Sequence, residues 1–471
     1  MKIQFRRVAS VAAVVAVMLP LTACDTDKLL AIIDPDQVTP ATLDDVSQIN
    51  TIIAGAISEF NQSYSGAGGD RFTSNVALFT DELMSTGTFS TRTATDRRNL
   101  FTPDNGNTHD SSYRELQVAR RALKDAAESL VRFELQSDPR FAQMKALEGF
   151  TYVALAEGFC SPIPFSDVVD GVREDGVPVT GTAALNLGIE RFDAAIGASS
   201  GDFGTMAKLG KARALLMLGN VAGAASAVAG VSTDFFIEVE HSDNSGGQNN
   251  PVWSLQSNGR YALSDAEGGN GAGLNFRTGH QVGLVGDPRS AWWEDPNRGF
   301  DPVFPLFVTR RHNRRTSNSI IADGIDARLI EAEAALASGN TTSWLTLLND
   351  LRANVDDLLS ARVDDYMSTL GGNAAAPNTV LNPLTDPGTA AGRVDLMFQE
   401  RGFWMFAQGR RLGDLRRLVN DYGRSAGDVY PSGVYHKGGQ HGTDVVFNLD
   451  FDEINNLSYD PSACNTTSTA F

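Results

Sequence analysis

The stretch QERGFWMFAQGRRLGDLRRL, residues 399–418, combines apolar helix-forming residues with a dense set of charges. Its five arginines are Arg401, Arg410, Arg411, Arg416 and Arg417. The carboxylates Glu400 and Asp414 lie among these arginines, which favours ion pairs that fix one helix against another. An external anion is the alternative partner. We therefore expect a helical scaffold whose packing depends on charge pairs between helices.

Helical periodicity recurs through much of the rest of the chain, with apolar residues at three- and four-residue steps. A capping box, Ser112-x-x-Glu115, predicts one helix start, and Asp138-Pro139 predicts another. The expected helices cover 43–60, 112–130, 139–154, 185–196, 206–216, 221–228 and 392–422.

A weak internal repeat appears when ARALLMLGN, residues 212–220, is aligned with AEAALASGN, residues 332–340. Small residues three or four apart let two helices approach closely, and the Gly-Asn pair that follows predicts a turn back into an antiparallel helix. This pattern is typical of a tetratricopeptide-like helical hairpin. The fold class we expect is mainly α, with a loop-rich portion that contains short strands.

That loop-rich portion is residues 230–320, where helical periodicity is lost and Gly, Asn and aromatic residues accumulate. Loops held on a rigid scaffold are common places for binding residues. Exposed indole or phenol rings suit stacking on a sugar, and nearby Asn and Arg suit its hydroxyl groups. The candidate stacking residues are Trp292, Trp293 and Tyr261, and the candidate polar partners are Arg298, Asn297 and Asn270.

Composition excludes several classes of protein. The 471 residues carry a formal net charge of −18, which disfavours binding to the phosphate backbone of nucleic acids. Three cysteines and six scattered histidines predict no metal site, and no nucleotide-cofactor motif occurs. A single Gly-x-Ser-x-Gly, residues 423–427, lacks the preceding buried strand that a nucleophile elbow requires. We expect neither a cofactor nor enzymatic activity.

The N-terminus has the three-part layout of a secretory signal. Lys2, Arg6 and Arg7 precede an apolar run from Val8 to Pro20. Thirteen apolar residues are too few to span a bilayer. The run ends at Leu21-Thr22-Ala23-Cys24, which matches the bacterial lipobox, in which the cysteine receives the lipid. We expect a signal peptide over 1–23, lipidation at Cys24 and a polar tether over 24–40.

The two other cysteines are Cys160 and Cys464. With Cys24 acylated, they are the two remaining thiols of an exported protein, in a compartment where disulfides persist. We therefore predict a disulfide that ties the end of a scaffold helix to the C-terminal tail.

Several segments together resemble the SusD/RagB family over nearly the whole chain that follows the signal peptide. Besides the lipobox and residues 399–418, they are ALEGFTYVALAEGFCSPIPFSD (146–167), Gly286-Asp287-Pro288-Arg289, DARLIEAEAALASGN (326–340), Leu348-Asn349-x-Leu351-Arg352 and FDEINN (451–456). The sequence departs from the family pattern at Leu412, where an aromatic is usual, and at Asn448-Leu449-Asp450, which replaces a Pro-rich lead.

The resemblance implies a lipid-anchored protein of the outer membrane, exposed at the cell surface. It would bind an oligomeric nutrient, such as a glycan or a peptide, and deliver it to a SusC-like TonB-dependent barrel. The expected organisation is one domain over 41–471, with scaffold at 41–229 and 321–425, a ligand-binding insertion at 230–320 and a tail at 426–471. The alternatives are a tetratricopeptide-type scaffold in envelope assembly and an exported glycoside hydrolase.

Overall fold

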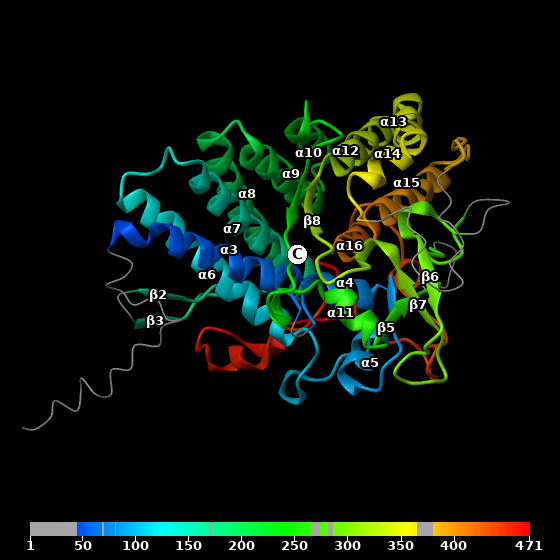
Figure 1. The fold of residues 1–471 in the computed structure, drawn as a ribbon, viewed down its shortest axis with the longest axis horizontal. Helices are drawn as coiled ribbons and strands as arrows, with labels where there is room; N and C mark the ends of the chain where they lie inside the picture. The colour runs from blue at the N-terminus through cyan, green and yellow to red at the C-terminus, as the bar shows by residue number, and fades with distance from the viewer. Residues whose placement is uncertain are drawn as a thin grey trace, which may run out of the picture.

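The computed structural model describes residues 45–67, 70–80, 82–169, 172–265, 274–280, 286–364 and 380–471. The expected signal peptide, the tether and Cys24 lie outside these ranges. Helices dominate the described part, as the sequence predicts (Figure 1). The long helices are α3 (Ile49–Ser65), α6 (Asp110–Arg132), α7 (Pro139–Gly158), α8 (Gly181–Ala198), α9 (Asp202–Met217), α12 (Gly324–Ala337), α13 (Thr341–Ala353), α15 (Ala390–Trp404) and α16 (Arg411–Asn420).

Successive helices pack as neighbours from α6 through to α10, and α12 packs on α13 in the same way. The shorter helices are α4 (Phe72–Phe79), α5 (Ser90–Asp96), α10 (Val221–Val228), α11 (Pro251–Ser257), α14 (Val355–Ser360) and α17 (Ala426–Val429). The repeated Gly-Asn turns are confirmed. Gly219 and Gly339 have φ of 71° and 80°, which glycine adopts without strain, and Asn220 and Asn340 then cap α10 and α13.

Four small antiparallel sheets of two strands each complete the described fold. The pairs are β1 (Leu83–Ser85) with β5 (Tyr261–Leu263), β2 (Asp167–Val169) with β3 (Val172–Glu174), β4 (Phe236–Val239) with β8 (Ser319–Asp323), and β6 (Trp292–Asp295) with β7 (Leu306–Thr309). Because β4 and β8 lie near the two ends of the loop-rich segment 230–320, their pairing brings those ends together on the scaffold.

Two helix predictions are wrong. The capping box at Ser112 does not form, because α6 begins at Asp110 and the Ser112 hydroxyl instead accepts a hydrogen bond from the Asn75 side chain at 2.7 Å. The expected helix 392–422 is broken between α15 and α16. At the break, Ala407 has a φ of 54°, and its N–H donates to the buried Glu82 carboxylate at 2.8 Å. Both differences come from long-range partners that the local sequence does not reveal.

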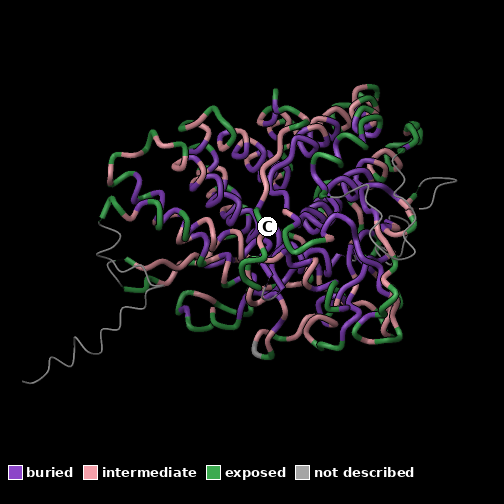
Figure 2. Tube along the Cα trace, in the orientation of Figure 1, coloured by how far each residue is buried: buried purple, intermediate pink, exposed green. Residues whose placement is uncertain are grey.

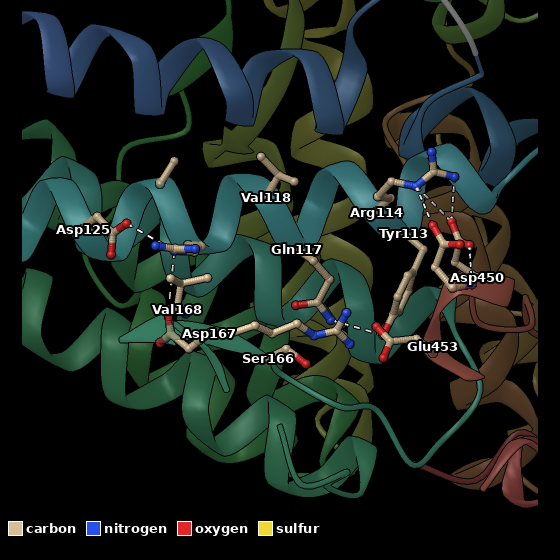
Figure 3. A pocket seen from close by; sticks show the side chains of 14 residues that line it. Tyr113, Arg114, Gln117, Val118, Asp125, Ser166, Asp167, Val168, Asp450 and Glu453 are labelled. Atoms are coloured by element: carbon tan, nitrogen blue, oxygen red, sulfur yellow. Dashed lines mark hydrogen bonds and ion pairs between the residues drawn. The ribbon is translucent and has the colours of Figure 1, made fainter. Parts of the chain in front are cut away.

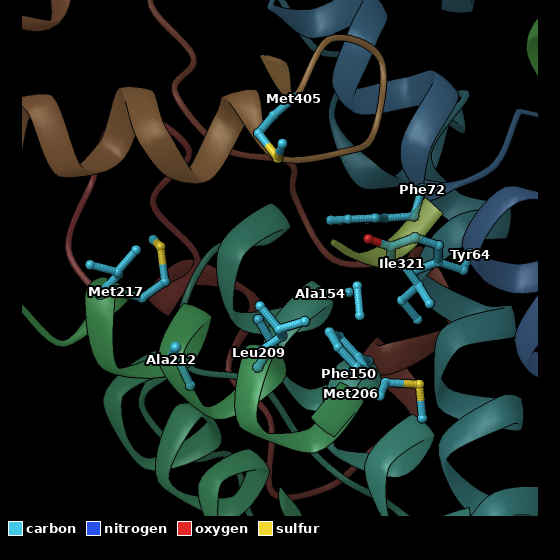
Figure 4. Close-up of a cluster of buried hydrophobic side chains, with 14 of the residues drawn as sticks. Tyr64, Phe72, Phe150, Ala154, Met206, Leu209, Ala212, Met217, Ile321 and Met405 are labelled. Carbon is cyan, nitrogen blue, oxygen red and sulfur yellow. The ribbon is translucent and has the colours of Figure 1, made fainter. Parts of the chain in front are cut away.

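The main core lies where α7 and α9 face α4 and the turn after α15. Figure 4 shows Phe150 and Leu209 of these two helices together with Phe72 and Met405. Small residues such as Ala154 and Ala212 are fully buried, so the helix backbones approach closely. Figure 2 shows the buried residues running through the centre of the molecule along these elements.

Buried charge pairs join the helices beside this core, as residues 399–418 predict. Arg401 of α15 contacts Asp414 of α16 at 3.0 Å and Asp326 of α12 at 3.2 Å. Arg417 shares Asp414 at 3.0 Å and also pairs with Glu333 of α12. All five side chains are less than about a twentieth exposed. The expectation of ion pairs between helices is therefore confirmed.

Glu400 forms a second junction on α15. Its two oxygens accept from Arg289 and Arg352, each at 2.6 Å, which ties α15 to the 3-10 turn Pro288–Ser290 and to α13. Arg416 acts differently, because its guanidinium donates to the carbonyls of Ala156 and Glu157 at the end of α7. Carbonyls at a helix C-terminus lack intrahelical partners, so a cation there is favourable.

We expect Asp414→Ala to destabilise the fold by about 3–5 kcal/mol, because it leaves Arg401 and Arg417 buried without a shared carboxylate. Urea denaturation followed by circular dichroism measures the change. Asp386→Ala is the matched control, since Asp386 pairs with Arg393 in an exposed position and its loss should change little. Equal midpoints for the two variants would contradict a structural role for the buried network.

The C-terminal tail is held against the end of α7. Cys160 and Cys464 form a disulfide with their Cα atoms 5.3 Å apart, within the range that disulfides require. Backbone bonds support it: Cys160 N–H donates to the Phe447 carbonyl at 2.8 Å, and Phe447 N–H donates to Gly158 at 2.8 Å. The disulfide closes a loop of 304 residues.

Replacing both cysteines, Cys160→Ala with Cys464→Ala, should lower the free energy of unfolding by up to about 6 kcal/mol, as the chain-entropy model gives for a loop this long. Peptide mapping without reductant should recover the Cys160–Cys464 pair. Recovery of two free thiols from the unreduced, denatured protein would rule out the disulfide.

Candidate ligand-binding site

Three of the hollows in the described surface differ in what they offer a ligand. The first is a groove of about 440 Å³ between α6, the β2–β3 hairpin and the segment around Glu453 (Figure 3). Several of its polar groups are paired with one another: Arg114 contacts Asp450 at 2.9 Å, and Tyr113 donates to Glu453 at 3.0 Å. These pairs already engage two of the carboxylates that line the groove.

The second hollow, of about 320 Å³, lies between α3 and residues 240–248. Amides such as Asn61 and Gln62 line it, together with His241. Burial lowers the pKa of His241 to about 4, so the ring is neutral near pH 7, and its Nε2 lies 3.1 Å from Ser319 Oγ. Apart from the His241 imidazole, no aromatic ring is among the described residues that line this hollow.

The third hollow, of about 370 Å³, combines exposed rings with a cation. The Phe89 and Phe300 side chains are 51% and 53% exposed, unusually open for phenylalanine. The guanidinium of Arg260 lies over both rings, with its carbon 3.3 Å from the Phe300 centroid and 4.7 Å from the Phe89 centroid. Ser254 and Asn258 of the α11 region complete the rim. We call this the Phe89–Phe300 pocket.

Backbone hydrogen bonds bring its three chain segments together. Phe300 N–H donates to the Gly259 carbonyl at 2.7 Å, and Asp301 N–H donates to Thr86 at 2.8 Å. Thr86 N–H in turn donates to the Arg260 carbonyl at 2.8 Å, which continues the β1–β5 pairing by one residue. The positions of Arg260 and Phe300 are thus set by main-chain bonds, independently of their own side chains.

The layer beneath the pocket is a buried polar cluster. Asp70 accepts from Arg92 at 2.9 Å and from the Tyr261 hydroxyl at 2.6 Å. Burial opposes the charge of Arg92, but the Asp70 carboxylate outweighs it and raises the Arg92 pKa. Burial, with Asp70 beside it, also raises the pKa of Tyr261 well above its usual value. These bonds hold Arg92 5.0 Å from the Phe89 ring centroid.

Neither a family model nor a curated protein matches the chain by sequence. Solved structures do match. A SusD superfamily protein from Bacteroides fragilis gives a TM-score of 0.58 at 13% identity, over 87% of this chain and 97% of that one. The chain has the SusD fold.

Two further neighbours agree on this fold. A SusD superfamily protein from Bacteroides vulgatus gives a TM-score of 0.57 at 14% identity, over 80% of this chain and 89% of that one. A laminarin-binding SusD-like protein gives 0.53 at 14% identity, over 88% and 98%. The resemblance that the sequence motifs indicate is confirmed at the level of the fold.

The SusD fold places the predicted site residues unevenly. Tyr261 is fully buried, so as a stacking platform it is a wrong prediction, and its ring instead supports Arg92. Trp292 and Trp293 are half-buried on β6, and the Trp292 indole donates to the Arg277 carbonyl at 2.6 Å. Arg298 is exposed but donates to the Pro302 and Val303 carbonyls. Asn297 is exposed and bonds Asp295, and Asn270 lies outside the described residues.

Sequence reasoning missed Phe89 and Arg260 as site residues, and it noted Phe300 only as one aromatic of the loop-rich segment. A local signal exists. Phe89 lies between Thr88 and Ser90, and Phe300 lies between Gly299 and Asp301, so neither belongs to an apolar period that would bury it. Isolated phenylalanines in polar loops are therefore candidates for residues that contact a ligand.

The described residues contain no group of three or more His, Cys, Asp or Glu side chains arranged to hold a metal ion. Within the same ranges, no helix has the length and apolar character that crossing a membrane requires.

Proposed function

We propose that this protein binds an oligosaccharide without chemically altering it and delivers it to a TonB-dependent barrel in the outer membrane. The observation that carries the proposal is the Phe89–Phe300 pocket, in which two exposed rings flank a guanidinium. The apolar faces of sugar rings stack on aromatic faces, and arginine and asparagine donate to hydroxyl oxygens. A volume of about 370 Å³ is at the lower end of the range of ligand pockets.

The residues around the pocket favour binding over hydrolysis. Glycoside hydrolysis uses two carboxyl groups that flank the scissile bond. The described lining of the Phe89–Phe300 pocket contains arginine, asparagine and serine but no carboxylate, and Asp70 beneath it is already bonded to Arg92 and Tyr261. The SusD fold shared with a laminarin-binding protein supports an oligosaccharide as the ligand.

The stacking hypothesis is tested with Phe89→Ala combined with Phe300→Ala. Isothermal titration against a panel of oligosaccharides, laminari-oligosaccharides included, should show affinity reduced at least tenfold, since each aromatic contact contributes about 1 kcal/mol. Val303→Ala is the control, because Val303 is 67% exposed in the same loop but does not line the pocket.

The same experiment also tests the predicted stacking residues Trp292 and Trp293 as a competing site. If Trp292→Ala with Trp293→Ala abolishes binding while the double phenylalanine variant binds normally, the ligand lies on β6 and the Phe89–Phe300 pocket is the wrong site. Unchanged binding by both double variants would exclude both.

Delivery to a barrel requires the anchor and the partner that the sequence motifs imply. Mass spectrometry of the native protein should find an acylated Cys24 as the first residue, and affinity purification from detergent-solubilised membranes should recover a TonB-dependent barrel. Cys24→Ala should move the protein out of the membrane fraction, because the lipid supplies the binding energy. An unmodified N-terminus that retains residues 1–23, or the absence of any barrel, would contradict the transport role.

A further inference from the structure

We infer that the ligand of the Phe89–Phe300 pocket is an acidic oligosaccharide, one whose uronate or sulfate group pairs with Arg260. This inference rests on the proposed function and names the class of substrate. Its basis is that the pocket presents a guanidinium that no carboxylate among the described residues neutralises.

Arg260 stands out from the arginines around it in what its guanidinium contacts. Across the residues that the structure describes, this group forms no ion pair and donates no hydrogen bond, and its Nη1 is covered yet has no acceptor. Arg92 is paired with Asp70, which lies 22 residues away in the sequence. Arg298 donates hydrogen bonds to two main-chain carbonyls. The stacked position of Arg260 leaves the N–H groups other than those of Nη1 for a ligand.

The stacking geometry suits an anion with planar or branched oxygens. The Phe300 ring covers one face of the guanidinium at 3.3 Å, so the donors that remain lie in its plane. In-plane N–H pairs bind carboxylate or sulfate oxygens in bidentate fashion, and these bonds are stronger than bonds to a neutral hydroxyl.

The local charge is positive in a strongly acidic protein. Two arginines and no carboxylate are among the described residues that line the pocket. Because Asp70 is matched by Arg92, the charge of Arg260 is left over. Burial and the nearby Arg92 charge both lower the pKa of Arg260, yet an arginine stays protonated at any physiological pH. A neutral glycan would leave the charge of Arg260 without a counter-charge, whereas an acidic glycan would neutralise it.

The experiment compares ligands that differ only in charge. Titrations use tetragalacturonate against its neutral methyl ester, and a sulfated galactan tetrasaccharide against its desulfated form. The variants are Arg260→Gln, which removes the charge, and Arg260→Lys, which keeps the charge but loses the planar fork. Arg173→Gln is the matched control, since it makes the same change in net charge at an exposed arginine on the β2–β3 hairpin, far from the pocket (Figure 1).

The wild-type protein and Arg173→Gln should bind one charged member of a pair at least tenfold more tightly than its neutral counterpart. Arg260→Gln should lose that preference, and Arg260→Lys should retain part of it, as expected when a charge-assisted bond is removed or weakened. Which pair shows the preference distinguishes a uronate from a sulfate ligand.

Equal binding of charged and neutral forms, or a preference that survives in Arg260→Gln, would overturn the inference. Binding that is confined to the neutral glycans of the wider panel would also overturn the inference. Those results would leave the proposed function standing if affinity for the neutral glycan still depended on Phe89 and Phe300. Failure of every oligosaccharide to bind, with no barrel recovered from membranes, would overturn both.

Discussion

The pairing of buried arginines with buried carboxylates constrains the whole scaffold. Arg401 and Arg417 share Asp414 while reaching Asp326 and Glu333 on α12, so α12, α15 and α16 have to meet in a register where all these charges are matched. A buried charge left without its partner costs several kcal/mol, so a slipped helix would be strongly disfavoured. Hydrophobic packing alone would tolerate more arrangements of such Ala- and Leu-rich helices.

The same stretch of chain extends this constraint to more distant elements. Glu400 holds the 3-10 turn that contains Arg289, and this turn leads directly into β6. Arg416 reaches both the end of α7 and the Ala470 carbonyl of the tail, close to where the disulfide attaches. The loop-rich segment and the C-terminal tail are therefore positioned by residues that also hold the helices together.

In the Phe89–Phe300 pocket, main-chain groups set the positions of the residues, and side chains form the surface that is open to a ligand. Main-chain bonds that pair Thr86 with Arg260 and Asp301, and Phe300 with Gly259, fix the shape of its rim, whereas the proposed recognition depends on the exposed side chains. Such a division allows the side chains to change without disturbing the scaffold. The contrast with the helical interior is clear in the arginines: Arg401 is enclosed by carboxylates, while Arg260 is stacked on rings and open to a partner.

The sequence by itself determined most of the helical fold. Periodicity located the helices, the Gly-Asn pairs located the turns, and the mixture of Arg401, Asp414 and Arg417 predicted ion pairs between helices, because each of these signals is local and chemically distinctive. The motifs also indicated the SusD fold, which the solved structures confirm. Local signals failed at Ser112 and at the break after α15, where partners distant in sequence compete with the helix.

Tertiary structure decided the candidate binding site. Phe89, Arg260 and Phe300 are 171 and 40 residues apart, and only the β1–β5 pairing and its continuation through Thr86 bring them together. The sequence also does not reveal which aromatic residues are buried. Tyr261 and Phe300 are both aromatic residues of the loop-rich segment, yet Tyr261 is fully buried and Phe300 is 53% exposed. Aromatic side chains suit cores and ligands alike, so their role follows from which neighbours the folded chain places around them.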